Sequence, residues 1–280
     1  MNRQITDEKI DSYREYLCRE EKAEATVKKY VREVGIFGKW LSGREVTKEL
    51  TARWKEELQT SGYVPRTVNA MLSSVNGFFS FMGWQDCRVK FLKIQRRMFR
   101  DESKDLDAEE YQRLVDAAYR LNNRRLGLVI ETICGTGIRV SELEYITVDA
   151  VKAGKAEIVL KGKVRVILMP GRLVRKLLNY AGEQNISAGQ IFRTRSGKNL
   201  SRRQIWAEMK KLCAAADVES SKVFPHNLRH LFAKTFYQAY GDIVRLADVL
   251  GHSSIDTTRI YLLSTGAEHV RQLDRLGLVS

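Results

Sequence analysis

Residues 225–261 read PHNLRHLFAKTFYQAYGDIVRLADVLGHSSIDTTRIY and hold three of the four histidines of this 280-residue chain. Pro225 suits the first turn of a helix, so we expect His226 and Arg229 on one face near the N-terminus of that helix. The positive end of the helix dipole there favours an anion. The Gly-Asp pair at 241–242 predicts the end of this helix and the cap of the next one.

The same segment predicts two further helices. Gly251 predicts the end of the second helix just before His252. A third helix, expected from about Asp256, would present Tyr261. A lone tyrosine beside apolar residues is usually a residue at the edge of a core. Here the spacing of the histidines and the arginine that precede Tyr261 favours a functional role for it.

The motif HNLRH followed by LGHSSIDTTRIY resembles the catalytic signature of the tyrosine recombinase (phage integrase) family, which includes the Xer and Cre enzymes. Two stretches upstream extend the resemblance. GTGIRVSELEYI (135–146) is similar to the family's first-arginine motif, and LKGKVRV (160–166) is similar to its catalytic-lysine turn. The resemblance covers nearly the whole chain and is weakest over the N-terminal helices.

The resemblance implies a catalytic set of Arg139, Lys161, His226, Arg229, His252 and the nucleophile Tyr261. A phosphodiester gathers negative charge on its non-bridging oxygens in the transition state, and two guanidiniums can clamp that charge. His252 can donate a further hydrogen bond there, while His226 can position or deprotonate the tyrosine hydroxyl, whose free pKa is about 10. Lys161 can protonate the departing 5′ oxygen. This chemistry requires no metal and no other cofactor.

Three neighbouring positions leave alternatives open. The turn Lys161-Gly-Lys163 is one residue shorter than the family's usual pattern, so Lys163 could occupy the functional position. Glu142, three residues after Arg139, matches an acidic position that could orient the active-site cations, or it forms a simple helix salt bridge. His230 also fits the family, although a hydrogen-bonded structural histidine is the more frequent role. We count Glu142 and His230 as supporting residues.

The chain carries a formal charge of +14 at pH 7. Such a positive field attracts nucleic acid or an anionic membrane. No apolar run approaches the about 20 residues that span a bilayer, and the N-terminal sequence lacks the apolar core of a signal peptide. The four cysteines lie far apart without a Cys-x-x-Cys pair, which predicts neither a zinc site nor a disulfide framework. These features favour a cytoplasmic protein that binds nucleic acid and no membrane.

Apolar spacing predicts four helices in the first part of the chain, over residues 6–19, 25–41, 47–60 and 66–82. They would form an α-helical domain over residues 1–86, which the resemblance identifies as a SAM-like core-binding domain. The run CRVKFLKIQRRMFR holds six basic and no acidic residues and begins the expected interdomain linker, residues 87–105. The catalytic tyrosine recombinase domain would follow over residues 106–280.

A capped helix start at residues 107–110 opens the second domain. Helical spacing continues over residues 126–134, 140–146 and from Leu173 onward. Three β-rich runs predict a small antiparallel sheet with its hairpin turn at residues 161–163: ITVDAV (146–151), AEIVL (156–160) and VRVILM (164–169). The predicted fold class is therefore mainly α, with a small antiparallel β-sheet.

Arginines in the basic linker or at expected helix starts are candidates for DNA binding: Arg66, Arg96, Arg97, Arg202 and Arg203. A basic linker between two domains favours contact with a DNA backbone. LSRRQIW (200–206) resembles a family segment that enters a major groove. The tail after Tyr261 resembles one that this family docks onto a neighbouring protomer, with Val270, Leu273 and Leu276 at roughly helical spacing. The alternative is a helix packed in cis.

The resemblance as a whole implies a site-specific recombinase that cleaves and rejoins DNA strands through a 3′-phosphotyrosyl intermediate and a Holliday junction. The expected partner is double-stranded DNA with inverted half-sites, on which protomers assemble into a tetramer. Integration or excision of a mobile element and Xer-like dimer resolution both stay open. A type IB topoisomerase would share the chemistry without exchanging partners. An accessory protein with a decayed active site would only bind DNA.

Overall fold

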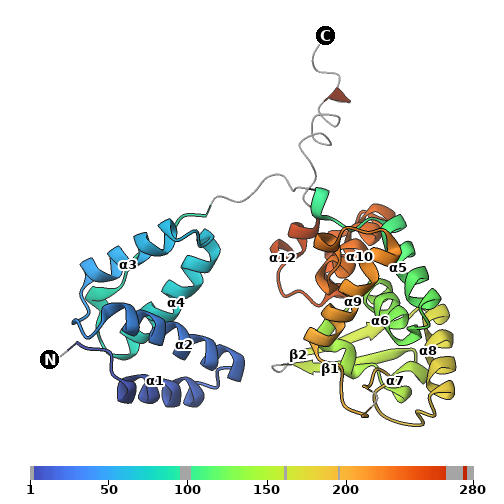
Figure 1. Ribbon diagram of the computed structural model, residues 1–280, viewed down its shortest axis with the longest axis horizontal. Coiled ribbons are helices and arrows are strands. Elements are labelled where there is room, and N and C mark those ends of the chain that lie inside the picture. Colours follow the sequence, from blue (N-terminus) through green and yellow to red (C-terminus); the bar gives the residue numbers. More distant parts are fainter. Residues whose placement is uncertain (1–2, 95–101, 161–162, 195, 263–273, 276–280) are drawn as a thin grey trace. The chain divides into compact units, whose positions relative to one another are not determined.

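A computed structural model describes residues 3–94, 102–160, 163–194, 196–262 and 274–275 of the chain. The chain divides into two units, Met1–Arg96 and Arg97–Ser280 (Figure 1). The larger unit carries every histidine and arginine of the predicted catalytic set. No described helix has the length and apolar character needed to cross a membrane.

The described part of the first unit is built on the four predicted helices, each within two residues of its expected bounds. They are α1 (Asp7–Arg19), α2 (Glu24–Leu41), α3 (Lys48–Thr60) and α4 (Pro65–Phe81). Thr6 and Thr47 cap α1 and α3 because each side chain accepts a hydrogen bond from a backbone N–H of the first turn. A cap of this kind stabilises a helix by about 1 kcal/mol.

Aromatic side chains fill the core of the first unit. Tyr13 meets Phe78 edge-on with ring centroids 5.3 Å apart, and Phe37 lies 4.8 Å from Trp54. The short 3-10 helix η1 (Gln85–Cys87) then places the fully buried Cys87 in the same core. These contacts give the four helices one shared apolar centre.

The first unit extends beyond the predicted boundary at residue 86. The Asn76 side chain hydrogen-bonds the backbone N–H and carbonyl of Val89, and Asn69 holds the backbone of Leu92 in the same way. Val89 and Leu92, which lie in the predicted linker over residues 87–105, are therefore tied to α4 and pack against the core of the first unit.

Helices make up most of the described part of the second unit. They include α5 (Ala108–Arg120), α6 (Arg124–Thr136), α8 (Gly171–Glu183), α9 (Arg202–Ala216), α10 (Pro225–Tyr240), α11 (Ile243–Leu250) and α12 (Ile255–Arg259). The 3-10 segments are η2 (Glu102–Lys104), η3 (Val140–Tyr145), η4 (Ser220–Lys222) and η5 (Ile260–Leu262). The predicted capping box at the start of α5 is present between Asp107 and Glu110.

Helix α6 lies at the centre of this unit. Its residues Leu126, Leu128, Val129, Ile130 and Ile133 are all buried, so apolar side chains surround the helix rather than lining one face. Helices α5, α8, α9 and α10 pack against it. The C-terminal end of α6 is therefore held inside the unit on several sides.

The sheet is a single hairpin in the described residues. Strand β1 (Lys155–Leu160) pairs with β2 (Lys163–Leu168) in antiparallel register, from Lys155 opposite Leu168 to Leu160 opposite Lys163. This confirms two of the three predicted β-rich runs.

The first of these runs, ITVDAV, is not a strand. Val148–Lys152 form the short helix α7, capped by the Thr147 side chain, and Val148 and Val151 are both buried. Valines three residues apart share one face of a helical turn, so the cap and the burial outweigh the β preference of valine.

Candidate active site

The turn after α6 brings the first predicted arginine into the site. Gly137 ends the helix at a left-handed φ of 65°, and a Cβ there would lie 2.4 Å from Cδ1 of Phe232 on α10. Only glycine fits, because both the backbone angle and the close approach exclude a side chain. Arg139 follows at the start of η3 with 44% of its side chain exposed.

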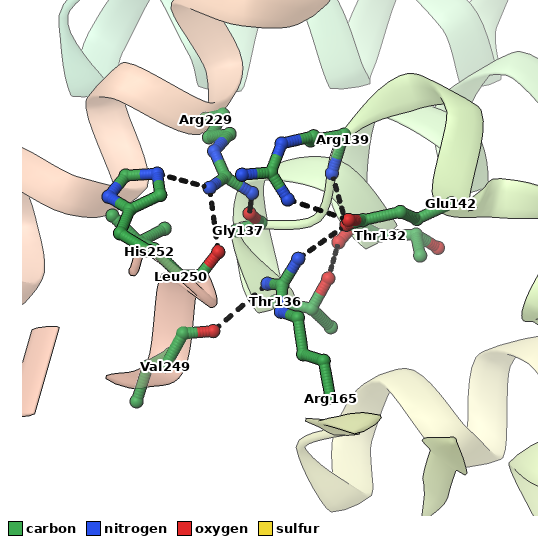
Figure 2. Close-up of polar contacts among 10 residues, drawn as sticks. All are labelled: Thr132, Thr136, Gly137, Arg139, Glu142, Arg165, Arg229, Val249, Leu250 and His252. Atoms are coloured by element: carbon green, nitrogen blue, oxygen red, sulfur yellow. Dashed lines mark hydrogen bonds and ion pairs between the residues drawn. The ribbon is translucent and has the colours of Figure 1, made fainter. Parts of the chain in front are cut away.

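The buried carboxylate of Glu142 holds two arginines. It accepts hydrogen bonds from the Arg139 backbone N–H and Nη1, both at 2.8 Å, and from Arg165 Nη1 at 2.6 Å (Figure 2). Burial raises the pKa of Glu142, but the hydrogen bonds from Arg139 and the charge of Arg165 outweigh it and hold the pKa below its usual value. Glu142 is thus ionised, and it binds the distant Arg165 on β2 as well as the neighbouring Arg139, which is more than a local helix salt bridge.

The second predicted arginine, Arg229 on α10, is only 2% exposed. Its Nη1 donates to the carbonyl of Gly137, and its Nη2 donates to the Leu250 carbonyl at 2.8 Å and to His252 Nε2 at 2.9 Å. Burial and the charge of Arg139 lower its pKa to about 10, while contact with the Tyr261 hydroxyl opposes that shift. Figure 2 shows this guanidinium where the turns after α6 and α11 meet.

The hydrogen bonds of His252 define which ring nitrogen carries the proton. A guanidinium N–H can only donate, so Nε2 of His252 accepts from Arg229 and the neutral ring has its proton on Nδ1. That proton points to Oγ1 of the buried Thr258, 2.9 Å away. Burial, followed by the charges of Arg229 and Arg139, lowers the pKa of His252 to about 4.

Tyr261 lies among three histidine rings. Its ring is parallel to that of His252 with centroids 5.8 Å apart, and it lies 5.6 Å from His226 and 5.4 Å from His230. The residue is 7% exposed and packs into a small apolar cluster with Leu250. It stands on η5, directly after α12, rather than on the third helix itself as the sequence predicted.

The predicted site residues fall into three groups. The structure brings together Arg139, Glu142, His226, Arg229, His230, His252 and Tyr261. Lys161, Arg96, Arg97, Val270, Leu273, Leu276 and the side chain of Lys163 lie outside the described residues. Arg66, Arg202 and Arg203 are exposed at the starts of α4 and α9.

Sequence reasoning missed two residues of this network, Arg165 and Thr258. Arg165 lies in a β-rich run, where only its place among the alternating residues of the strand distinguishes it. Thr258 is three residues before Tyr261, and its neighbour Thr257 is chemically identical in the sequence. The structure separates the two threonines because the hydroxyl of Thr258 meets His252.

The described network contains three guanidiniums and one carboxylate, so it carries an excess of positive charge. The charge of Arg139 lowers the pKa of both Arg165 and Arg229, and the charge of Arg165 also lowers that of Arg229. Guanidiniums held close together in a partly buried site are stabilised by an anion with several oxygens. A phosphate group bound there would lie next to the Tyr261 hydroxyl, which contacts Arg229.

The tautomer of His252 is directly testable. Between about pH 6 and 8 we expect the nitrogen-15 spectrum to show a neutral ring with the proton on Nδ1, because the pKa is about 4 and Arg229 occupies Nε2. Thr258→Val removes the acceptor of that proton, and because Arg229 still donates to Nε2, the ring should keep its proton on Nδ1 while the Nδ1 resonance shifts with the lost hydrogen bond. A doubly protonated His252 in this pH range would contradict the arrangement.

Two family models match the chain. Residues 104–268 match the model described as "Phage integrase family", and residues 10–86 match "Phage integrase, N-terminal SAM-like domain". Tyrosine recombinase XerA of Thermococcus kodakarensis is 30% identical over 275 residues, which cover 95% of this chain and 94% of the relative. Tyrosine recombinase XerA of Pyrococcus furiosus is 27% identical, covering 96% and 93%.

Solved structures share the fold at lower identity. The XerH site-specific recombinase bound to difH substrate in a pre-cleavage complex is 18% identical with a TM-score of 0.69, covering 96% of this chain and 89% of that one. The lambda integrase tetramer bound to a Holliday junction is 17% identical with a TM-score of 0.73, covering 91% and 76%.

Proposed function

This chain belongs to the phage integrase family of tyrosine recombinases, enzymes that cut and rejoin DNA, and we propose that it carries out site-specific recombination through Tyr261. One observation supports the proposal above all others. The Tyr261 ring is parallel to His252, and its hydroxyl contacts Arg229 in a network with an excess of positive charge. A nucleophile and an anion-binding site thus occur together.

The proposed reaction begins with a phosphodiester of the substrate between Arg139 and Arg229. Both guanidiniums donate to its non-bridging oxygens, where charge develops in the transition state. His252 would exchange its Arg229 contact for the phosphate and donate from Nε2, which requires a second proton or a change of tautomer. The transition state carries extra negative charge on the phosphate oxygens. This charge favours protonation of His252 because it offsets the positive charges of the arginines that lower its pKa.

Tyr261 then attacks phosphorus. Its oxygen forms the new P–O bond while the bond to the 5′ oxygen breaks, leaving a 3′-phosphotyrosyl ester and a 5′ hydroxyl. His226, which is exposed on the first turn of α10 beside the tyrosine ring, takes the phenolic proton. Lys161, or Lys163 in its place, supplies the proton of the 5′ hydroxyl. Reversal by a 5′ hydroxyl from another strand rejoins the DNA without further energy input.

The proposed substrate is double-stranded DNA with inverted half-sites, on which the protein forms a tetramer and passes through a Holliday junction. Exposed Arg66, Arg202 and Arg203 would contact its backbone and grooves. The lambda integrase structure named above is itself a tetramer on a Holliday junction, which supports this arrangement. The proposal includes a cytoplasmic location for the enzyme.

Selection from a random-sequence duplex library tests this proposal. The protein is incubated with the library, protected or covalently captured fragments are sequenced, and two copies of the recovered site are placed on one plasmid. We expect an inverted repeat to emerge, and we expect the plasmid to recombine between its two copies. Relaxation of any supercoiled plasmid without site preference would instead identify a type IB topoisomerase, and binding without capture would identify an accessory protein.

A further inference from the structure

Arg165 is largely buried on a strand that exposes three of its aliphatic residues. On β2, Arg165 pairs with the buried Ile158 of β1 and lies on the same side as the buried Ile167. The opposite side is exposed and carries Val164, Val166 and Leu168. A strand is expected to bury its apolar residues and expose its charge, so this inversion has a cost in desolvation that needs an explanation.

The guanidinium of Arg165 joins two separate parts of the site. Nη1 donates to Glu142 Oε2 at 2.6 Å, and Nη2 donates to the Val249 carbonyl at 2.9 Å (Figure 2). Glu142 in turn holds Arg139. Val249 is in the last turn of α11, three residues before His252. The Arg165 side chain thus contacts both the segment that carries Arg139 and the segment that carries His252.

The stem of Arg165 also fills the space beside the turn before His252. Gly251 has a left-handed φ of 63°, and a Cβ there would lie 2.3 Å from Arg165 Cδ and 2.7 Å from its Nε. The neighbouring Leu250 carbonyl accepts from Arg229. The turn at residues 249–252 is therefore enclosed by two arginines, one from β2 and one from α10.

We propose that Arg165 is a positioning residue for DNA cleavage, which holds Glu142 and the turn at residues 249–252 at a fixed distance from the hairpin. Its guanidinium bonds to Glu142 and Val249, and its described partners do not include Tyr261, whereas Arg229 contacts the Tyr261 hydroxyl, so Arg165 acts through Arg139 and His252 rather than on the substrate. This inference rests on the proposed function. Displacing catalytic groups by about 1 Å costs about 100-fold in rate.

Three variants test the inference by single-turnover adduct formation on a nicked duplex carrying the recovered site. Arg165→Met should slow adduct formation about 100-fold at saturating DNA, while the Kd for DNA changes less than about twofold. Arg165→Lys should fall between, because an ammonium can pair with Glu142 but cannot also reach Val249. Arg175→Met removes an exposed arginine of α8 and serves as the control, with the wild-type rate expected.

A double-mutant cycle with Glu142→Gln separates positioning from general loss of structure. If Arg165 acts through Glu142, the double variant should cleave about as slowly as the slower single variant, well above the product of the two separate losses. Additive losses, or a wild-type rate in Arg165→Met, would overturn the inference. Circular dichroism and DNA binding check the fold, and Arg165→Lys retains the charge if the methionine variant unfolds. If the wild-type protein forms no adduct, the proposed function itself is wrong.

Discussion

Tyr261→Phe is expected to form no covalent adduct on a nicked duplex that traps the wild-type enzyme. The substitution removes the only atom that forms the new bond to phosphorus, so the rate should fall by at least about 10⁴-fold. The ring should keep its place between His252 and the apolar cluster, because phenylalanine fills the same volume. We expect the free energy of unfolding to change by no more than about 1 kcal/mol.

Tyr240→Phe is the matched control for this variant. Tyr240 is an exposed residue at the end of α10, so loss of its hydroxyl should leave adduct formation at the wild-type level. Electrophoresis under denaturing conditions resolves the adduct, and mass spectrometry of the digested complex identifies the modified peptide. An adduct in Tyr261→Phe at the wild-type level would show that another residue is the nucleophile.

The sequence predicted the helix bounds around His226, Arg229 and His252 because local signals fix them. Pro225 begins α10, Gly241 ends it, and Gly251 ends α11 directly before His252. Each signal acts within a few residues, through a fixed φ or a left-handed turn. The spacing between His226, Arg229 and His252 therefore translates directly into geometry.

Interactions over long distances in the chain were less accessible. Arg165 bonds to groups 23 and 84 residues away, and nothing in the run VRVILM identifies those partners. Its alternation with Ile167 does place the two residues on the same side of the strand, which could have marked a charge directed inward. The predicted strand over residues 146–151 was wrong for a related reason. Burial of Val148 and Val151 against distant parts of the chain favours a helix there.

The two arginines that we propose clamp the phosphate, Arg139 and Arg229, should differ in what their loss does to the protein. Arg139→Ala and Arg229→Ala are each expected to reduce cleavage by about 10³-fold or more, because each removes a guanidinium from the developing charge, while DNA binding persists. Arg139 is partly exposed, and Glu142 keeps its contact with Arg165 when Arg139 is removed. The stability of Arg139→Ala should therefore stay close to that of the wild type.

Loss of Arg229 should also destabilise the second unit, because this buried side chain satisfies the carbonyls of Gly137 and Leu250. Leaving such groups without a donor costs about 1–3 kcal/mol each, so Arg229→Ala should unfold at clearly lower urea concentration than Arg139→Ala. Arg229→Lys should recover part of the stability but little of the rate, since an ammonium lacks the planar fork that clamps two oxygens. Urea titration and single-turnover cleavage measure the two effects separately. Equal stability of Arg139→Ala and Arg229→Ala would show that the guanidinium of Arg229 does not join the ends of α6 and α11.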